Sequence, residues 1–262
     1  MSILSRSAVV RSHSSLIRSL IHCSVFVASL LFALNPPAVA QTNPADLSDA
    51  EEVRIGKLLA QDFMQQEGMA PTPQSIKLDA FLQKVGDRVA ANAQRKIPYT
   101  FHFDPSPSFR SAVGLPGGQV FVGGGILAMM DTEDQLAVVL GHEVEHIDLN
   151  QCRERLTQVL KDQHLAAADV KEMKVDPFLD GYGHDKEFAA DREGVKLAIK
   201  AGYSPEGGIR LLQMYVILGQ QLTHAPSEAQ SNLEARIAQI KDVMKSEGDK
   251  KYPPEKKLEF PE

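Results

Sequence analysis

Residues 142–146 read His-Glu-Val-Glu-His and match the H-E-x-x-H pattern. Residues four apart on an α-helix point in nearly the same direction, so His142 and His146 would project from one helix face. That arrangement suits two ligands of one tetrahedral zinc ion. Glu143 lies about 100° further round the helix, beside the metal, where its carboxylate could take a proton from metal-bound water. The segment therefore predicts two zinc ligands, His142 and His146, with Glu143 as the catalytic base.

A third protein ligand has to come from elsewhere in the chain. The metzincin pattern would place Gly and His where this chain has Leu149 and Cys152, so that class is excluded. Cys152 could bind zinc, although a lone thiol of this kind is more often a packed residue. Glu187 and Asp191 lie four residues apart and would share one helix face, which on its own could simply be solvated. Beside the two histidines, we expect Glu187 to be the third ligand and Asp191 to accept the outer N–H of a ligating histidine.

The elements that must position these residues are mainly helices. Apolar spacing and turn residues predict helices over 49–66, 74–93, 131–150, 185–201, 206–220 and 230–246, and a weakly patterned helical stretch over 151–180. An alternating run predicts a strand over 99–103, and a turn at residues 116–118 precedes a short strand over 119–122. The sequence thus predicts one α+β domain, mainly helical, with a small sheet on one side.

The first forty residues have the pattern of a signal peptide. Three arginines precede an apolar stretch from Leu20 to Leu34, and a small-x-small cleavage site follows at Ala38-Val39-Ala40. The apolar stretch is shorter than the roughly 20 residues that a membrane-spanning helix needs; an uncleaved N-terminal anchor is the alternative. We therefore expect residues 1–40 to be removed, and residues 41–246 to form the metal-binding domain.

The bulk composition narrows the range of partners. The chain has 28 Lys and Arg against 34 Asp and Glu, a net charge of −6 that becomes more negative without the leader. This balance argues against binding nucleic acid or anionic lipid through charge. Of the two cysteines only Cys152 follows residue 40, so the mature chain cannot form an internal disulfide. We expect no integral membrane span in the mature chain and a charged, disordered tail over 247–262.

Four blocks occur in order along the chain. They are Leu-Pro-Gly-Gly-Gln-Val-Phe-Val at 115–122, Leu-Gly-His-Glu-Val-Glu-His at 140–146, Glu-Phe-Ala-Ala-Asp-Arg at 187–192, and Thr-His-Ala-Pro at 223–226 with Arg236 further on. Together they resemble the HtpX, BepA and CAAX-prenyl-protease group of gluzincin metallopeptidases. The resemblance implies a zincin-like fold with one zinc ion per chain. It also implies that an extended peptide pairs with an edge strand at the border of the cleft, formed by Gln119, Val120, Phe121 and Val122.

His224 and Arg236 take their expected roles from this resemblance. His224 could stabilise the oxyanion, or it could occupy the open zinc position and hold the enzyme latent; a surface-loop histidine is the other interpretation. Arg236 is expected to support the ligands from behind, as Asp191 does. The chain departs from the family pattern at Ala225, which interrupts Thr-His-Pro, and at residues 111–113, where Ser-Ala-Val replaces Asn-Ala-Phe.

These features predict a zinc-dependent metalloendopeptidase of the periplasm or cell envelope. Its substrates would be extended or unfolded protein segments, and its role would be protein quality control. Glu143 would remove the proton of the attacking water and later deliver it to the leaving amine. The alternative from another class is an envelope chaperone or assembly factor of the same fold with little turnover. The intact Glu143 favours the enzyme.

Overall fold

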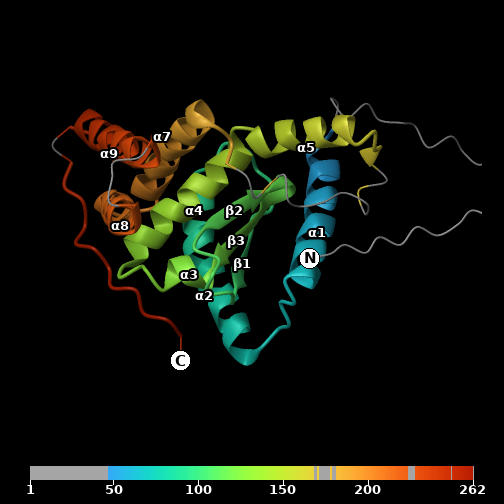
Figure 1. The fold of residues 1–262 in the computed structure, drawn as a ribbon, viewed down its shortest axis with the longest axis horizontal. Helices are drawn as coiled ribbons and strands as arrows, with labels where there is room; N and C mark the ends of the chain where they lie inside the picture. The colour runs from blue at the N-terminus through green and yellow to red at the C-terminus, as the bar shows by residue number, and fades with distance from the viewer. Residues whose placement is uncertain are drawn as a thin grey trace, which may run out of the picture. The chain divides into compact units, whose positions relative to one another are not determined.

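The computed structural model describes residues 47–167, 170, 178, 181–223, 228–248 and 250–261. The expected signal peptide and His224 lie outside these residues. The helices are α1 Asp49–Gln66, α2 Pro73–Ala90, α3 Gly124–Leu127, α4 Glu133–Asp148, α5 Gln151–Asp162, α7 His184–Lys200, α8 Glu206–Thr223 and α9 Glu228–Ser246 (Figure 1). The strands are β1 Thr100–Asp104, β2 Ala112–Leu115 and β3 Gln119–Gly123, and a single 3-10 turn, η2 Pro116–Gly118, joins β2 to β3.

The predicted fold class is confirmed. The chain is mainly helical, with one small mixed sheet. Reciprocal capping boxes set the starts of three helices: Ser48 caps α1, Thr72 caps α2 and Thr132 caps α4. In each capping box, side chains accept hydrogen bonds from backbone N–H groups that the first turn of the helix leaves unpaired. These three helices begin within two residues of the predicted positions. No helix among the described residues is both long and apolar enough to cross a membrane.

The three strands lie in the order β1-β3-β2. β1 pairs parallel with β3, and β2 pairs antiparallel with β3 from Ala112↔Val122 to Leu115↔Gln119. Residues 119–122, predicted as the edge strand, therefore lie in the central strand, and that prediction is wrong. Because β3 pairs on both sides, its backbone groups have no free edge to offer a peptide. The edge strand on the α4 side is β2, which the sequence analysis missed as a strand.

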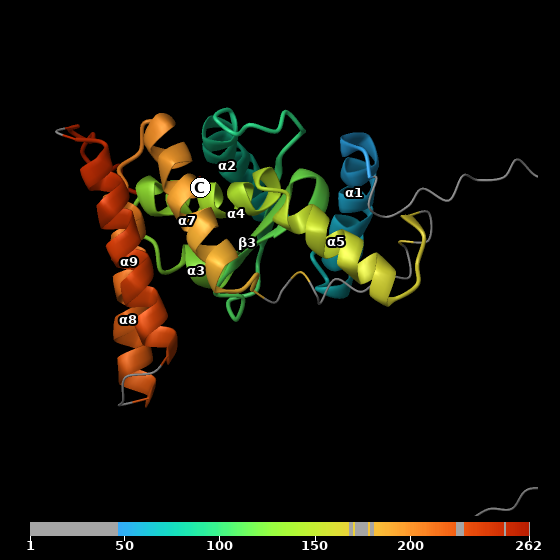
Figure 2. The ribbon, with the colours of Figure 1, turned by 90° about the horizontal axis from the view of Figure 1, so that it is seen from above.

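Helices cover both faces of this sheet. Phe101, Val120 and Val122 point to one face and join the larger apolar core, which includes residues of α2 and α4. Leu115 and Phe121 point to the other face and pack with residues of α1 and α5. Figure 2 shows α1 on one side of β3, with α2 and α4 on the other. Because side chains alternate along a strand, β3 contributes to both cores and is buried throughout.

The two helices that carry the predicted ligands approach each other at the level of the backbone. Gly141, one residue before His142 on α4, lies against Gly194 of α7. A Cβ atom at Gly141 would lie 2.4 Å from the Gly194 carbonyl oxygen, and a Cβ atom at Gly194 would lie 2.6 Å from the Gly141 carbonyl carbon. Neither position leaves space for a side chain, so the close contact of α4 and α7 depends on glycine at both.

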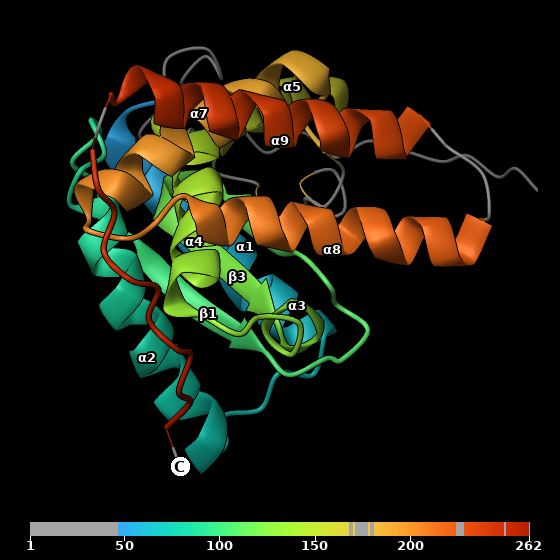
Figure 3. The same ribbon diagram turned by 90° about the vertical axis from the view of Figure 1, so that its left-hand side faces the viewer.

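α8 and α9 lie side by side and extend beyond the rest of the domain (Figure 3). The chain then turns back, and its last described residues run along the start of α4. Lys256 N–H donates to Asp134 at 2.8 Å, Thr132 and Lys257 form an antiparallel bridge, and Leu258 is buried. The expectation of a disordered tail is wrong for residues 250–261. Backbone pairing, the buried Leu258 and the contact of the Phe260 ring with Phe81 hold them, and their charged composition concealed these contacts.

Candidate metal centre

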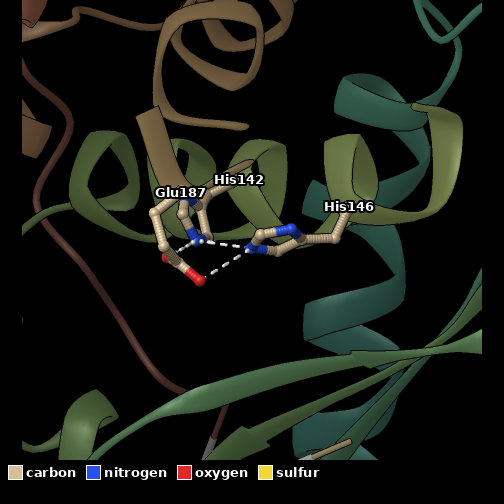
Figure 4. A group of neighbouring side chains, drawn as sticks. All are labelled: His142, His146 and Glu187. Carbon is tan, nitrogen blue, oxygen red and sulfur yellow. Dashed lines mark hydrogen bonds and ion pairs between the residues drawn. The ribbon is translucent and has the colours of Figure 1, made fainter. Parts of the chain in front are cut away.

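His142 and His146 of α4 and Glu187 of α7 point toward one another (Figure 4). Nε2 of His142 lies 3.0 Å from Nε2 of His146 and 3.3 Å from Oε2 of Glu187. Nε2 of His146 lies 3.8 Å from Oε1 of Glu187. Tetrahedral zinc with bonds of about 2.0–2.1 Å separates its ligand atoms by roughly 3.3 Å. The three residues therefore have the donor atoms and the spacing to hold a metal ion.

The charges around the two histidines also fit a cation. Burial alone would lower the pKa of His142, but hydrogen bonds with Asp191 and Glu187 raise it to about 10. The pKa of His146 falls to about 3, because burial and the neighbouring charge on His142 both oppose its protonation. The carboxylates of Asp191 and Glu187 thus favour a positive charge near the two Nε2 atoms. Protonating both histidines would place two like charges side by side, which is unfavourable. A divalent ion held by His142, His146 and Glu187 would supply this positive charge.

Glu143 lies beside the three ligands and is not one of them. Its side chain is buried, and its Oε2 accepts a 2.7 Å hydrogen bond from the backbone N–H of Gly114 in β2. Burial is the main cause that raises the pKa of Glu143, against the opposing charge of His142. A Cβ atom at residue 114 would lie 2.9 Å from the carbonyl oxygen of Glu143, so β2 can approach α4 only with glycine there. Strand β2 holds this carboxylate at the metal centre.

A line of charged groups supports His142 from behind. Nδ1 of His142 lies 2.9 Å from Oδ1 of Asp191 on α7. Arg236 of α9 donates to both oxygens of Asp191, from Nε at 2.5 Å and from Nη2 at 2.7 Å. Burial opposes charge on Asp191, but Arg236 and His142 outweigh it and lower the pKa of this carboxyl. An ionised Asp191 keeps the His142 proton on Nδ1 and leaves Nε2 free for a metal.

Two residues that the sequence analysis missed support the other two ligands. Oε1 of Gln151, the first residue of α5, lies 2.7 Å from Nδ1 of His146. The ring of Tyr182 stacks on the His146 imidazole with centroids 4.4 Å apart, and its backbone N–H donates to Oε1 of Glu187 at 2.9 Å. No spacing rule marks either residue. α4 ends before Gln151, so helical periodicity does not connect it to His146, and Tyr182 precedes α7 in an irregular segment.

Strand β2 presents part of its backbone away from β3. The N–H of Gly114 binds Glu143, and its carbonyl accepts a hydrogen bond from Cys152 Sγ at 3.4 Å. In an antiparallel pair the outward-facing residues alternate, so Ala112 also turns its backbone groups away from β3. Cys152 itself is buried beneath the strand and is not one of the three clustered ligands.

A cavity of about 640 Å³ opens beside the ligands and is called the apolar chamber below. Many of its apolar side chains come from α3 and the turn after it, α4, α8 and α9: Ile126, Met129, Val138, Val139, Leu211, Leu212, Leu218, Leu233 and Ile240. Val138 and Val139 precede His142 by four and three residues, so they lie on the ligand face of α4. Arg110 and Ala112 reach the same cavity from the β2 side. The chamber thus connects the edge strand to the metal centre and can hold a large apolar side chain.

His224 lies outside the described residues, so its three interpretations stay as the sequence left them. Arg236, whose role was inferred only from a resemblance, lies in direct contact with Asp191. Its distance along the chain gave no hint of this contact. α9 packs against α7, and this packing places residue 236 beside Asp191.

Comparison with known proteins agrees with this geometry. Residues 77–244 match the family model of peptidase family M48, and this range contains all the ligand and supporting residues described above. A stretch of 104 residues is 34% identical to the mitochondrial metalloendopeptidase OMA1 of Schizosaccharomyces pombe. That match covers 38% of this chain and 30% of the relative, so the chain is matched to less than a third of the relative's length.

Proposed function

This chain belongs to peptidase family M48 and is a metallopeptidase, and from that premise we propose that it is a zinc-dependent endopeptidase. Its substrates are extended or unfolded protein segments, and it acts in protein quality control. We further propose that it is a secreted member of the HtpX, BepA and CAAX-prenyl-protease group. The observation that carries the proposal is the convergence of His142, His146 and Glu187, with Glu143 beside them.

The donor set favours zinc over the harder divalent ions. Two imidazole nitrogens and one carboxylate are the ligands of many catalytic zinc sites, which keep a fourth position for water or substrate. Magnesium and calcium prefer sites built from oxygen. A bound zinc ion would polarise both the attacking water and the scissile carbonyl. Three protein ligands leave a position open, which is the arrangement of a catalytic site and not of a closed structural one.

The residues of the chain itself perform the proton transfers and the positioning. Glu143 takes a proton from the attacking water and returns it to the leaving amine. Its buried surroundings raise its pKa toward the working range of a general base, and the Gly114 N–H fixes one of its oxygens so that the other can face the reaction. Asp191, held by Arg236, keeps His142 in the tautomer that binds metal.

Substrate recognition falls to β2 and the apolar chamber. An extended peptide can add to the outward edge of β2 at Ala112, with the next outward residue, Gly114, already holding Glu143. One of its side chains then enters the apolar chamber. Folded proteins bury large apolar side chains and pair their strands internally, so this combination selects unfolded segments.

The test is chelator-sensitive cleavage of a disordered protein. Purified protein should contain about one zinc per chain and cut casein, and a chelator should abolish cleavage until zinc is restored. Glu143→Gln should keep its zinc and lose about 10²–10⁴-fold or more in turnover. His142→Ala, His146→Ala and Glu187→Ala should lose the metal. Full zinc in Glu187→Ala contradicts the ligand set, and normal turnover by Glu143→Gln contradicts the mechanism.

The same experiment separates the peptidase from a chaperone. A chaperone of this fold would suppress aggregation of an unfolded protein without cutting it, and Glu143→Gln would match the wild type. We expect the wild type to release casein fragments and Glu143→Gln to bind casein uncut.

Secretion is supported by the leader pattern in residues 1–40. We propose that the mature chain works in the periplasm or cell envelope. Mass spectrometry of protein from that compartment should find a chain that begins at Gln41. A chain that keeps residues 1–40 and needs detergent for extraction would instead indicate an N-terminal anchor.

A further inference from the structure

We propose that Tyr182, anchored by Arg155 of α5, is a positioning residue that holds two of the three metal ligands in place. This inference rests on the proposed function, because it assumes that His146 and Glu187 bind zinc. Tyr182 contacts both of them, and they come from different helices, α4 and α7. α5 is a third helix and contributes no ligand.

The first contact uses the peptide unit between Gly181 and Tyr182. Its N–H donates to Oε1 of Glu187 at 2.9 Å. Its carbonyl accepts a hydrogen bond of 2.9 Å from Nη2 of Arg155. A planar trans peptide points these two groups in opposite directions, so fixing the carbonyl also aims the N–H. By binding the carbonyl, Arg155 thereby orients the N–H that holds the Glu187 carboxylate.

The second contact uses the ring of Tyr182. It stacks on the His146 imidazole at 4.4 Å with an angle of 24° between the planes. The guanidinium of Arg155 lies 4.0 Å from the centroid of the same ring. An imidazole could otherwise rotate about the bond that joins it to Cβ, and Gln151 restrains that rotation at Nδ1 alone. The ring of Tyr182 restrains the plane of the imidazole.

The hydroxyl of Tyr182 reaches the strand that holds the catalytic base. It donates to Cys152 Sγ at 3.2 Å, and Cys152 donates to the carbonyl of Gly114, the residue whose N–H binds Glu143. Gln151, Cys152 and Arg155 all lie in the first turn and a half of α5. The N-terminal end of α5 therefore supports the metal centre, and Tyr182 connects it to the ligands His146 and Glu187.

The test measures zinc affinity by competition with a chromophoric chelator. Tyr182→Leu removes the stacked ring, and we expect its zinc dissociation constant to rise about 10–100-fold, the usual effect of losing a residue that supports a ligand. Tyr182→Phe keeps the ring and the backbone N–H, so its zinc affinity should stay close to that of the wild type. Arg155→Met should weaken zinc binding in the same direction as Tyr182→Leu. The absorption spectrum of the cobalt-substituted protein should change in Tyr182→Leu and not in Tyr182→Phe.

Tyr203 offers a matched control. Tyr203 is buried and, like Tyr182, lies against an arginine, with Arg88 4.6 Å from its ring centroid and donating to its hydroxyl. It contacts none of the three ligands, so Tyr203→Leu should lower the melting temperature and leave zinc affinity unchanged.

Three results would overturn the inference. They are wild-type zinc affinity in Tyr182→Leu, loss of affinity in Tyr203→Leu to the same degree, and, if Tyr182→Leu does not fold, wild-type affinity in Arg155→Met. A wild-type protein without zinc affinity would instead overturn the proposed function, and this inference with it.

Discussion

The helix pair α4–α7 and the helix pair α8–α9 both border the metal centre, in different ways. α4 and α7 meet through their backbones at Gly141 and Gly194, and together they carry all three ligands. α8 and α9 carry no ligand. They provide the ionic contact of Arg236 with Asp191 and several of the apolar side chains that line the apolar chamber. α8 also touches the backbone of α4, at Gly207 and Asp134, but that contact lies about two turns before His142. Nearer the ligands a side chain mediates the packing, where Gly208 of α8 faces Val138.

We relate this difference to two tasks: α4 and α7 position the metal ligands, whereas α8 and α9 line the cavity proposed to bind substrate. Metal ligands must keep their spacing to a few tenths of an ångström, and a direct backbone contact allows no rotamer change to alter it. A wall of apolar side chains tolerates substitution, because its members can repack while the cavity keeps its general shape. We therefore expect equal substitutions in the two helix pairs to have unequal effects on catalysis.

The largest effect is expected where the backbones touch. Gly194→Ala adds a methyl group 2.6 Å from the Gly141 carbonyl carbon and His142 N, so α7 must move away from α4. Glu187 would move with it. Displacements of this kind can cost on the order of 10²-fold in activity, and we expect at least that loss in casein cleavage together with weaker zinc binding.

Gly208→Ala is the matched substitution in the other pair. The added methyl group meets Val138 Cγ1 at 2.7 Å, an atom that a change of rotamer can move. We expect some loss of thermal stability, with zinc content and turnover close to the wild type. Equal losses of zinc in Gly194→Ala and Gly208→Ala would break the comparison.

The next largest effect is expected at Arg236, through which α9 forms an ion pair with Asp191 at the metal centre. Arg236→Gln removes both hydrogen bonds to Asp191 and should reduce zinc affinity and kcat/KM by about 10–100-fold. Arg192→Gln is the control, since Arg192 is exposed and pairs with its neighbour Glu193, an arrangement that contributes little. If zinc affinity survives in Arg236→Gln while the melting temperature falls, Arg236 only braces α9.

A smaller and more selective effect is expected in the apolar chamber. Val139→Trp replaces a residue that is not a ligand and fills part of the cavity, so peptides with Leu or Phe beside the scissile bond should lose more activity than peptides with Ala. Pocket changes of this size shift discrimination by about 10-fold or somewhat more. The measurement is kcat/KM on paired peptides. Ile76→Trp, on the exposed side of α2, is the control and should leave the preference unchanged.

The smallest effect is expected at Glu145, a second buried glutamate on α4, and concerns the pH dependence of stability. Glu145, two residues after Glu143, is also buried, and its Oε2 has no hydrogen-bond partner among the described residues. Burial, with Asp148 and Glu193 nearby, raises its pKa from the ordinary value of 4.5 to about 8. The folded state thus binds this proton more tightly than the unfolded state, so its stabilising contribution is lost as pH rises from about 4.5 to about 8.

Glu145→Gln keeps the shape of the side chain and removes its ionisation. Its melting temperature should exceed that of the wild type at pH 8 by a few degrees, and the difference should shrink toward pH 5. Calorimetry at intervals across this range provides the measurement. Parallel curves for the two proteins would show that Glu145 does not titrate between the two states in this range.

Local features of the sequence were enough to predict the longer helices and the candidate ligands, although not the short helix α3. The caps at Ser48, Thr72 and Thr132 act within four residues of themselves, so they mark helix starts before any tertiary contact exists. The i, i+4 spacing of His142 and His146 is equally local. The carboxylate of Glu187 was found because a helical segment carried it and the chemistry of zinc required a third donor.

The order of the strands and the supporting residues Gln151, Tyr182 and Arg155 depended on tertiary structure alone. β2 has four residues with a glycine among them, so no alternation marked it, and β3 took its place in the prediction. Gln151, Tyr182 and Arg155 act across gaps in the chain where helices end and new ones begin. Periodicity describes how one element presents its own side chains. The neighbours of each element are determined only in the folded protein, where the apolar faces of all the elements are buried together.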